Sequence, residues 1–191
     1  MDESVLIQSA KSGDHEAFNH LVLVYQDMVY NHAHAILGES DSAEDAVQES
    51  FIKAFRGLKG YRGGSFRAWL LRITTNTCYD ELRRSNHRQD VDDWQVGEDG
   101  EEYELLDLLP SPELSPDAQL EQSELMAAIQ RGLQRLPVEY RAAAIIVDVL
   151  GFDYAEAAAS LGVPVGTVKS RLARARQGLR QYLAQSLQPV H

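Results

Sequence analysis

Residues Ser160 to Arg180 have the sequence "SLGVPVGTVKSRLARARQGLR". Leu161 to Pro164 has the pattern of a helix end, a glycine and a short turn. A new helix then opens at residues 165–167, with Thr167 as its expected cap. The preceding segment, Tyr154 to Leu161, is a helix rich in small side chains, which let a second helix cross closely. Two helices joined by such a turn form a helix-turn-helix, whose second helix enters the major groove of DNA.

The second helix of this motif has an apolar face and a polar face. The apolar face is a stripe at helical spacing, formed by Val168, Leu172, Ala175 and Leu179. The other face carries Thr167, Ser170, Arg171 and Arg174, which could meet phosphates and base edges. A helical hairpin with a solvated basic face is the alternative, but the pattern favours DNA binding.

The composition sets limits on the class of protein. A chain of 191 residues, 44% apolar and 25% charged, is typical of a soluble globular protein with one or two domains. The sequence has no apolar run long enough to span a membrane and no basic, apolar N-terminal signal. Cys78 is the single cysteine, which excludes an internal disulfide and a cysteine-based zinc site. These features predict a protein of the reducing cytoplasm with no membrane insertion of its own.

The net charge of −11 is unevenly distributed along the chain. Residues 1–50 carry −9, residues 51–89 carry +7, residues 90–121 carry −12 and residues 122–191 carry +3. Two basic blocks separated by an acidic one indicate two separate nucleic-acid contacts. We therefore expect positive charge to be confined to the surfaces that meet DNA.

Hydrophobic periodicity predicts an all-α protein. Helices are expected over residues 14–37, from Asp41 onward, and from a Ser65 cap to about His87, with residues 57–65 as a glycine-rich loop. Residues 90–117 contain three prolines and two glycines without sustained periodicity, which is typical of a flexible linker. A second bundle is expected from about Ala118, with Pro137 at a first helical position. The prediction is two helical domains, 1–89 and 118–191, joined by a flexible acidic linker.

The sequence gives no support to an enzyme. His32 and His34 point away from each other on a helix, and no phosphate-binding, hydrolase or metalloprotease motif occurs. We therefore expect no catalytic activity, no metal and no cofactor.

Two further surfaces have open interpretations. Asp45, Gln48, Glu49 and Ile52 share one helix face beside Glu44, and either a docking surface for a basic partner or a solvated face would explain them. The segment from Lys53 to Arg88 mixes basic side chains with aromatic rings. This combination suits the stacking of nucleobases from single-stranded DNA or of a nucleobase extruded from a duplex. The members of this mixture are Lys59, Tyr61, Arg62, Phe66, Arg67, Trp69 and Arg72. Phe66 and Trp69 could equally be core residues.

Two long stretches resemble one family. "DSAEDAVQESFIKAFRGLKGYRGGSFRAWLLRITTNTCYDELRR" (Asp41 to Arg84) resembles the promoter-melting domain of bacterial sigma factors of the extracytoplasmic-function (ECF) group. "LPVEYRAAAIIVDVLGFDYAEAAASLGVPVGTVKSRLARARQGLR" (Leu136 to Arg180) resembles the second domain of that family, with its helix-turn-helix. The two stretches occur in the family's order, so the resemblance covers nearly the whole chain.

The resemblance implies a role for each surface. The clamp coiled coil of core RNA polymerase would be bound by Glu44, Asp45, Gln48, Glu49 and Ile52. The −10 promoter element would be recognised and opened by Lys59, Tyr61, Arg62, Ser65, Phe66, Arg67, Arg72, Asn76 and Arg83. The −35 element would be read by Thr167, Lys169, Ser170, Arg171 and Arg174, in a domain that also docks on the polymerase flap. An anti-sigma factor is a further expected partner.

The linker has the length that this scheme needs. Its 28 residues reach about 90 Å when extended at roughly 3.3 Å each, and two helical turns of DNA span about 70 Å. The resemblance places it in the channel later used by RNA. Two other classes remain as alternatives: a stand-alone helix-turn-helix regulator of duplex DNA, and an acidic interaction protein whose basic segments are solvated helices.

Overall fold

The computed structural model describes residues 2–84 and 116–186, with side chains from residue 124 onward in the second range. Every regular element within these two ranges is helical, which confirms the all-α prediction. The chain divides into two compact units, residues 1–85 and residues 86–191, and each is described by itself. The expected linker over residues 90–117 lies almost entirely outside the described residues.

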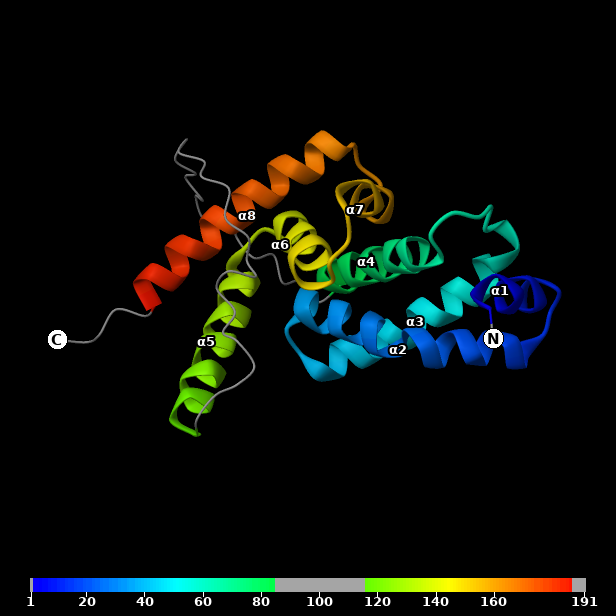
Figure 1. Ribbon diagram of the computed structural model, residues 1–191, viewed down its shortest axis with the longest axis horizontal. Helices are drawn as coiled ribbons and strands as arrows, with labels where there is room; N and C mark the ends of the chain where they lie inside the picture. The colour runs from blue at the N-terminus through cyan, green and yellow to red at the C-terminus, as the bar shows by residue number, and fades with distance from the viewer. Residues whose placement is uncertain (1, 85–115, 187–191) are drawn as a thin grey trace. The chain divides into compact units, whose positions relative to one another are not determined.

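The first unit is a bundle of four α-helices (Figure 1). Its elements are α1 (Glu3–Lys11), α2 (His15–Leu37), α3 (Ser40–Gly57), the short 3₁₀-helix η1 (Leu58–Gly60) and α4 (Phe66–Arg84). Helices α2, α3 and α4 pack against one another, and α1 covers the end of the bundle where α2 begins. The apolar stripe predicted on residues 14–37 lines the core, where Leu21, Val29 and Ile36 are at most 1% exposed.

Local signals define the ends of these helices. Asp14 caps α2 by accepting hydrogen bonds from the backbone N–H groups of Glu16 and Ala17 at 2.9 and 3.2 Å. Gly38 ends the same helix in the left-handed conformation, at φ 84°. Ser65 caps α4 through a bond from the Ala68 N–H to its Oγ at 3.2 Å. The Ser65 cap and the helix end after residue 37 were expected from the sequence, whereas Asp14 was expected as the first helical residue and is instead the cap.

The second unit is built around its last helix. Its elements are α5 (Pro116–Arg135), α6 (Val138–Ala144), a π-helical turn η3 (Ile145–Val149), α7 (Tyr154–Leu161) and α8 (Val165–Ser186). Helices α5, α6 and α7 all pack on α8, which crosses the unit as one long rod (Figure 1). The predicted stripe of α8 is its buried face, with Val168, Leu172, Ala175 and Leu179 at most 2% exposed.

Two residues explain how α5 joins this unit. Arg141 of α6 is 1% exposed, and its guanidinium donates to the backbone oxygens of Leu133, Gln134 and Leu136 at 2.6–3.0 Å. The cation thus satisfies carbonyls at the C-terminus of α5, where the helix dipole favours positive charge. A Cβ on Gly132 would lie 2.5 Å from Leu179, so this glycine permits the close crossing of α5 and α8.

The structure corrects four details of the sequence prediction. Thr167 is not the cap of α8, because the helix begins at Val165 and the Thr167 N–H already bonds to the Pro164 carbonyl. Pro137 precedes α6 as its cap residue instead of opening it. The expected loop at residues 57–65 is helical through Gly60. Helix α3 begins at Ser40, one residue before the expected start.

Candidate nucleic-acid interface

The helix-turn-helix of the second unit consists of α7, a turn over residues 162–164 and α8. Asp153 caps α7 by accepting from the backbone N–H groups of Ala155 and Glu156, both at 2.8 Å. Gly162 ends α7 at φ 66°, a left-handed conformation that favours glycine. The small residues Ala157 and Ser160 are at most 1% exposed, as a close crossing of α7 over α8 requires.

The face of α8 opposite the buried stripe is open. Lys169, Ser170 and Arg174 are exposed, while Thr167 and Arg171 are half-buried. The Ser170 hydroxyl donates to the Thr167 backbone oxygen at 3.0 Å. The structure therefore brings all five residues predicted for this contact onto the N-terminal half of one helix, where a recognition helix meets base edges.

Two of the basic side chains on this face rest on tyrosines. The Lys169 ammonium lies 5.3 Å from the centroid of the Tyr154 ring, within the range of a cation–π interaction. Arg174 donates to the Tyr140 hydroxyl at 2.9 Å, and its guanidinium carbon lies 5.9 Å from the ring centroid. Sequence reasoning missed both tyrosines, because they belong to α6 and α7 and only the fold brings them to α8.

Two other arginines show that positive charge is not confined to surfaces that could meet DNA. Arg176 forms a bidentate ion pair with Asp148 of η3, at 2.6 and 3.1 Å, and both side chains are largely buried. Arg141 is buried against the end of α5. The expectation that all basic side chains face DNA is therefore wrong for these two residues. Their charges bind polar groups inside the second unit.

The second candidate contact centres on the segment Tyr61–Ser65, here called the glycine loop. It connects η1 to α4, and its residues from Arg62 to Ser65 are exposed. Gly63 and Gly64 have φ values of 97° and 92°, in the left-handed region that favours glycine. A Cβ at either position would meet nothing within 4 Å, so backbone conformation and not crowding explains both glycines.

A cluster of aromatic side chains packs next to the glycine loop. The Tyr61 ring packs against Phe66 and Trp69 at centroid distances of 5.5 and 5.2 Å, and Tyr25 of α2 packs on Phe66 at 5.5 Å. The Tyr61 hydroxyl donates to the Gly64 carbonyl at 2.6 Å, and burial raises the pKa of this phenol.

Burial changes the roles of two predicted DNA contacts. Tyr61 is 7% exposed and Phe66 is 2% exposed, so neither ring is available to stack on a base in this structure. In this conformation both rings contribute apolar area to the core of the first unit, and their direct contact with DNA stays a prediction. Both rings support the loop, and the half-buried Trp69 joins the same cluster.

The remaining residues predicted for the −10 contact are accessible. Lys59, Arg62, Ser65, Arg72, Asn76 and Arg83 are exposed, and Arg67 is half-buried. Arg72, Asn76 and Arg83 fall at intervals that place them on one side of α4. Arg83 lies 3.5 Å from Asp80 on the same helix, an exposed pair that contributes little stability.

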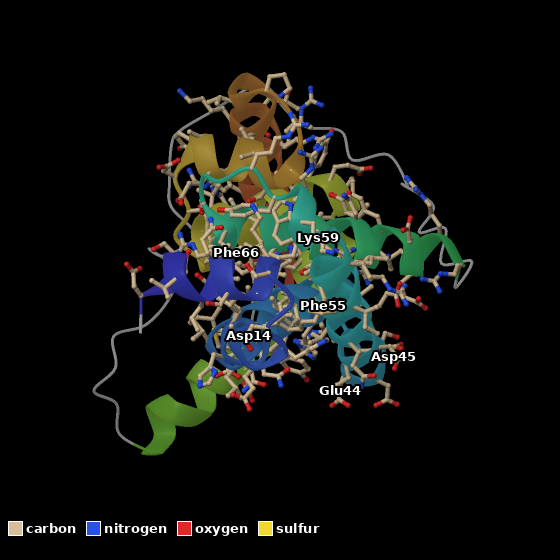
Figure 2. The ribbon with its side chains drawn as sticks, turned by 90° about the vertical axis from the view of Figure 1, so that its right-hand side faces the viewer. Asp14, Glu44, Asp45, Phe55, Lys59 and Phe66 are labelled. Atoms are coloured by element: carbon tan, nitrogen blue, oxygen red, sulfur yellow. The ribbon has the colours of Figure 1, made fainter. Side chains whose placement is uncertain are left out.

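The acidic surface predicted for polymerase lies at the beginning of α3. Glu44, Asp45, Gln48 and Ile52 are exposed and Glu49 is half-buried, so the expected face exists. Figure 2 shows Glu44 and Asp45 at the opposite end of α3 from Lys59, which precedes the glycine loop. The acidic surface and the basic loop are therefore separated on the first unit, and one partner could occupy each.

Other titratable groups in the described residues belong to the interior. His32 is completely buried, its Nε2 lies 2.8 Å from Thr75 Oγ1, and burial lowers its pKa to about 3. Burial likewise raises the pKa of Cys78 to about 12, which makes it a poor nucleophile. Within residues 2–84 and 116–186, no group of three or more potential ligands could hold a metal ion. The same ranges contain no helix with the length and hydropathy of a membrane span.

A helix-turn-helix and two separate basic faces define a DNA-binding protein of two helical units. The family models agree with this division: "Sigma-70 region 2" matches residues 21–88, and "Sigma-70, region 4" matches residues 126–179. The chain is 40% identical to the ECF RNA polymerase sigma factor SigE of Mycolicibacterium smegmatis, over 91% of this chain and 65% of that protein. It is 34% identical to the RNA polymerase sigma-H factor of Pseudomonas aeruginosa, over 97% of this chain and 93% of that protein.

Solved structures point to the same family. The sigma factor RpoE of Bartonella quintana, crystallised with the anti-sigma factor NepR, is 28% identical with a TM-score of 0.62, over 87% of this chain and 96% of that one. CnrH, in complex with the cytosolic domain of CnrY, has a TM-score of 0.67 at 25% identity, over 95% of this chain and 96% of that one. The chain belongs to the ECF group of RNA polymerase sigma factors.

Proposed function

We propose that this sigma factor directs core RNA polymerase to promoters through two DNA contacts, one in each helical unit. The observation that carries the proposal is the order of the two region models, region 2 on the first unit and region 4 on the second. Each model covers a set of exposed basic side chains, on the glycine loop and α4 in one case and on α8 in the other.

The first domain, residues 1–89, has two tasks in this proposal. Its acidic surface binds the basic side of the polymerase clamp coiled coil, with Glu44, Asp45, Gln48, Glu49 and Ile52 as the contacting residues. Its basic surface recognises and opens the −10 element. There the glycine loop holds an extruded base, and the phosphate and base contacts come from Lys59, Arg62, Ser65, Arg67, Arg72, Asn76 and Arg83.

The second domain, residues 118–191, reads the −35 element with Thr167, Lys169, Ser170, Arg171 and Arg174, and docks on the polymerase flap. The acidic linker over residues 90–117 occupies the RNA channel until the transcript displaces it. The protein supplies no catalytic group, because phosphodiester formation belongs to the polymerase. It acts in the cytoplasm, where polymerase and chromosome are, and an anti-sigma factor restrains it, as the complex of the Bartonella quintana relative suggests.

The test is promoter-directed transcription. Core polymerase with this chain is expected to start transcripts at defined positions in a library of promoters, while core polymerase alone does not. No initiation across the library, together with tight sequence-specific binding of duplex DNA by the chain alone, would favour the stand-alone regulator instead.

A further inference from the structure

The glycine loop is tied to the N-terminal helix by a hydrogen bond between residues fifty positions apart. The Lys11 ammonium, at the last residue of α1, donates to the backbone oxygen of Tyr61 at 2.8 Å in a partly buried position. A hydrogen bond from a charged donor is roughly twice as strong as a neutral one. The contact therefore holds the main chain at the first residue of the loop.

Lys11 has an unusual place in the sequence. It is the single Lys or Arg among the first fifty residues, which carry ten acidic residues. A lysine at the end of a helix usually interacts with the helix's own last carbonyls or with a nearby acid. Here the ammonium reaches the backbone of a distant loop, which general solubility does not require.

Helix α1 is itself firmly attached at both ends. Leu6, Ile7 and Ala10 are at most 6% exposed in the core that also contains Tyr61 and Phe66. At the other end of α1, Glu3 accepts a hydrogen bond from Tyr25, whose ring packs on Phe66. The two links lie eight positions apart, about 12 Å along the helix. Figure 1 shows α1 at the end of the bundle where the segment before α4 folds over.

The loop needs such a support because its own sequence does not define its shape. Gly63 and Gly64 have access to many backbone conformations, and no neighbour restricts a Cβ at either position. The Tyr61 side chain is held by the aromatic cluster and by its bond to the Gly64 carbonyl. The Tyr61 main chain is held at its oxygen by Lys11 and at its N–H by the Leu58 carbonyl, at 3.0 Å. The side chain and the main chain of Tyr61 are thus both fixed. The exposed residues from Arg62 to Ser65 follow directly after this fixed residue.

We propose that Lys11 is a positioning residue for base recognition, which holds the Tyr61 backbone so that the glycine loop presents one shape to an extruded −10 base. The inference rests on the proposed role of this loop. Lys11 does not touch the DNA in this scheme. Its loss widens the range of loop conformations and so reduces discrimination among the four bases, while the contact with polymerase stays intact.

The test compares three variants of the full-length protein. Lys11→Met keeps the aliphatic stem and removes the ammonium, Lys11→Arg keeps a charged donor, and Gln8→Met alters an exposed residue one turn earlier on α1. The first measurement is the rate of tryptic cleavage after Arg62 in the loop, relative to cleavage after Arg72 inside α4. The second is the base preference at each −10 position, from initiation by polymerase on a library that varies every position.

We expect Lys11→Met to accelerate cleavage after Arg62 and to reduce discrimination at one −10 position by about tenfold, the effect of losing one hydrogen bond to a charged group. Lys11→Arg and Gln8→Met should behave as the unaltered protein, and all variants should bind core polymerase equally. Unchanged cleavage in Lys11→Met would overturn the proposed tie. Faster cleavage with unaltered base preference at every position would show that the tie exists and that the loop does not read a base, which refutes its proposed function.

Discussion

Arg174 and Arg176 stand two residues apart on α8, yet their surroundings differ completely. Arg174 is exposed and held over Tyr140, while Arg176 is largely buried in an ion pair with Asp148. Residues two apart on a helix point about 200° away from each other, so one faces solvent and the other faces the core. The recognition role proposed for Arg174 and the structural role of Arg176 thus fall to two side chains of identical chemistry.

Alanine substitutions should distinguish the two roles. Arg176→Ala leaves the buried Asp148 carboxylate without its partner, and we expect the free energy of unfolding to fall by about 3 kcal/mol. Arg174→Ala should leave stability within about 0.5 kcal/mol and weaken the −35 contact. Thermal unfolding and promoter binding by the polymerase complex measure the two effects. Equal loss of stability in both variants would mean that Arg174 is structural.

The same variant would identify the kind of DNA contact that is proposed for Arg174. A base-edge contact should change the preference at one −35 position by about 1–3 kcal/mol. A phosphate contact should weaken all sequences and reduce the slope of the salt dependence by about 1.

His32 should make the stability of the first unit depend on pH. Burial lowers its pKa to about 3 from 6.5, so only the unfolded chain binds a proton as the pH falls below 6.5. The His32 contribution to stability is complete above pH 6.5 and should be lost at about 1.4 kcal/mol per pH unit as the pH falls towards 3. Urea unfolding of the protein and of His32→Gln, between pH 7 and pH 5, measures the difference. Identical pH dependence in both would contradict the assignment.

At the scale of the element, α5 and α8 illustrate how one glycine sets a helix crossing. Gly132 lies opposite Leu179 and Tyr182, whose nearest atoms would be 2.5 and 2.8 Å from an added Cβ. Gly166 lies in the first turn of α8, where an added Cβ would meet nothing within 4 Å. Both residues are glycines inside helices, so they form a matched pair.

Alanine should have opposite effects at the two glycines. Gly132→Ala gains helix propensity, but it forces α5 and α8 apart, and we expect a net loss of about 1–2 kcal/mol from overpacking. Gly166→Ala meets no obstacle and should gain about 0.5–1 kcal/mol. Calorimetric unfolding of both variants checks the signs, and a stabilising Gly132→Ala would show that α5 can move away at little cost.

The residues of the acidic surface lie together on one face of one helix, α3. Reversal of Asp45 and Glu49 to Lys should weaken binding to core polymerase at least about tenfold, since like charges then face a basic partner. The fold should persist, because Asp45 is exposed and the Glu49–Lys53 pair, at 3.7 Å, lies near the surface. Reversal of the exposed Glu16 and Asp27 on α2 makes the same change in net charge elsewhere. Equal loss in both double variants would indicate a net-charge effect and not a docking face.

At the scale of the whole molecule, the distribution of charge governs how the free protein meets DNA. Residues 90–121 carry −12 between a segment of +7 and a segment of +3. Attraction of the basic faces to DNA is mainly electrostatic and weakens with salt. A covalently attached acidic segment competes for those faces and repels phosphates, so the free chain should bind promoter duplex poorly.

Neutralising the linker should relieve this inhibition. With the acidic residues between 90 and 113 replaced by Asn and Gln, we expect duplex affinity of the full-length protein to rise about tenfold at low salt. The two proteins should converge as the Debye length shortens to about 3 Å at 1 M salt. Salt titrations of both proteins on one −35 duplex make the comparison. Tight, specific binding by the unaltered chain, equal to that of the neutralised one, would favour the stand-alone regulator.

Short-range signals in the sequence define the local parts of this protein. The caps at Asp14 and Ser65, the left-handed end at Gly38 and the buried stripe of α8 depend on interactions within a few residues, so their spacing is visible in the chain. The helix-turn-helix follows from the same short-range signals. The family resemblance then supplied expected roles for residues on surfaces that local rules left open, such as the acidic face of α3.

Which basic side chains and aromatic rings remain exposed depends on how distant helices pack. Arg141 and Arg176 cannot be told from other arginines in the sequence. Arg141 is buried because it binds the last carbonyls of α5, and Arg176 is largely buried because it pairs with the buried Asp148 carboxylate of η3. Tyr61 and Phe66 lie in the core because removing their apolar rings from water stabilises the first unit. Lys11 meets Tyr61 across fifty residues, a contact that depends on where α1 packs and that no local spacing can reveal.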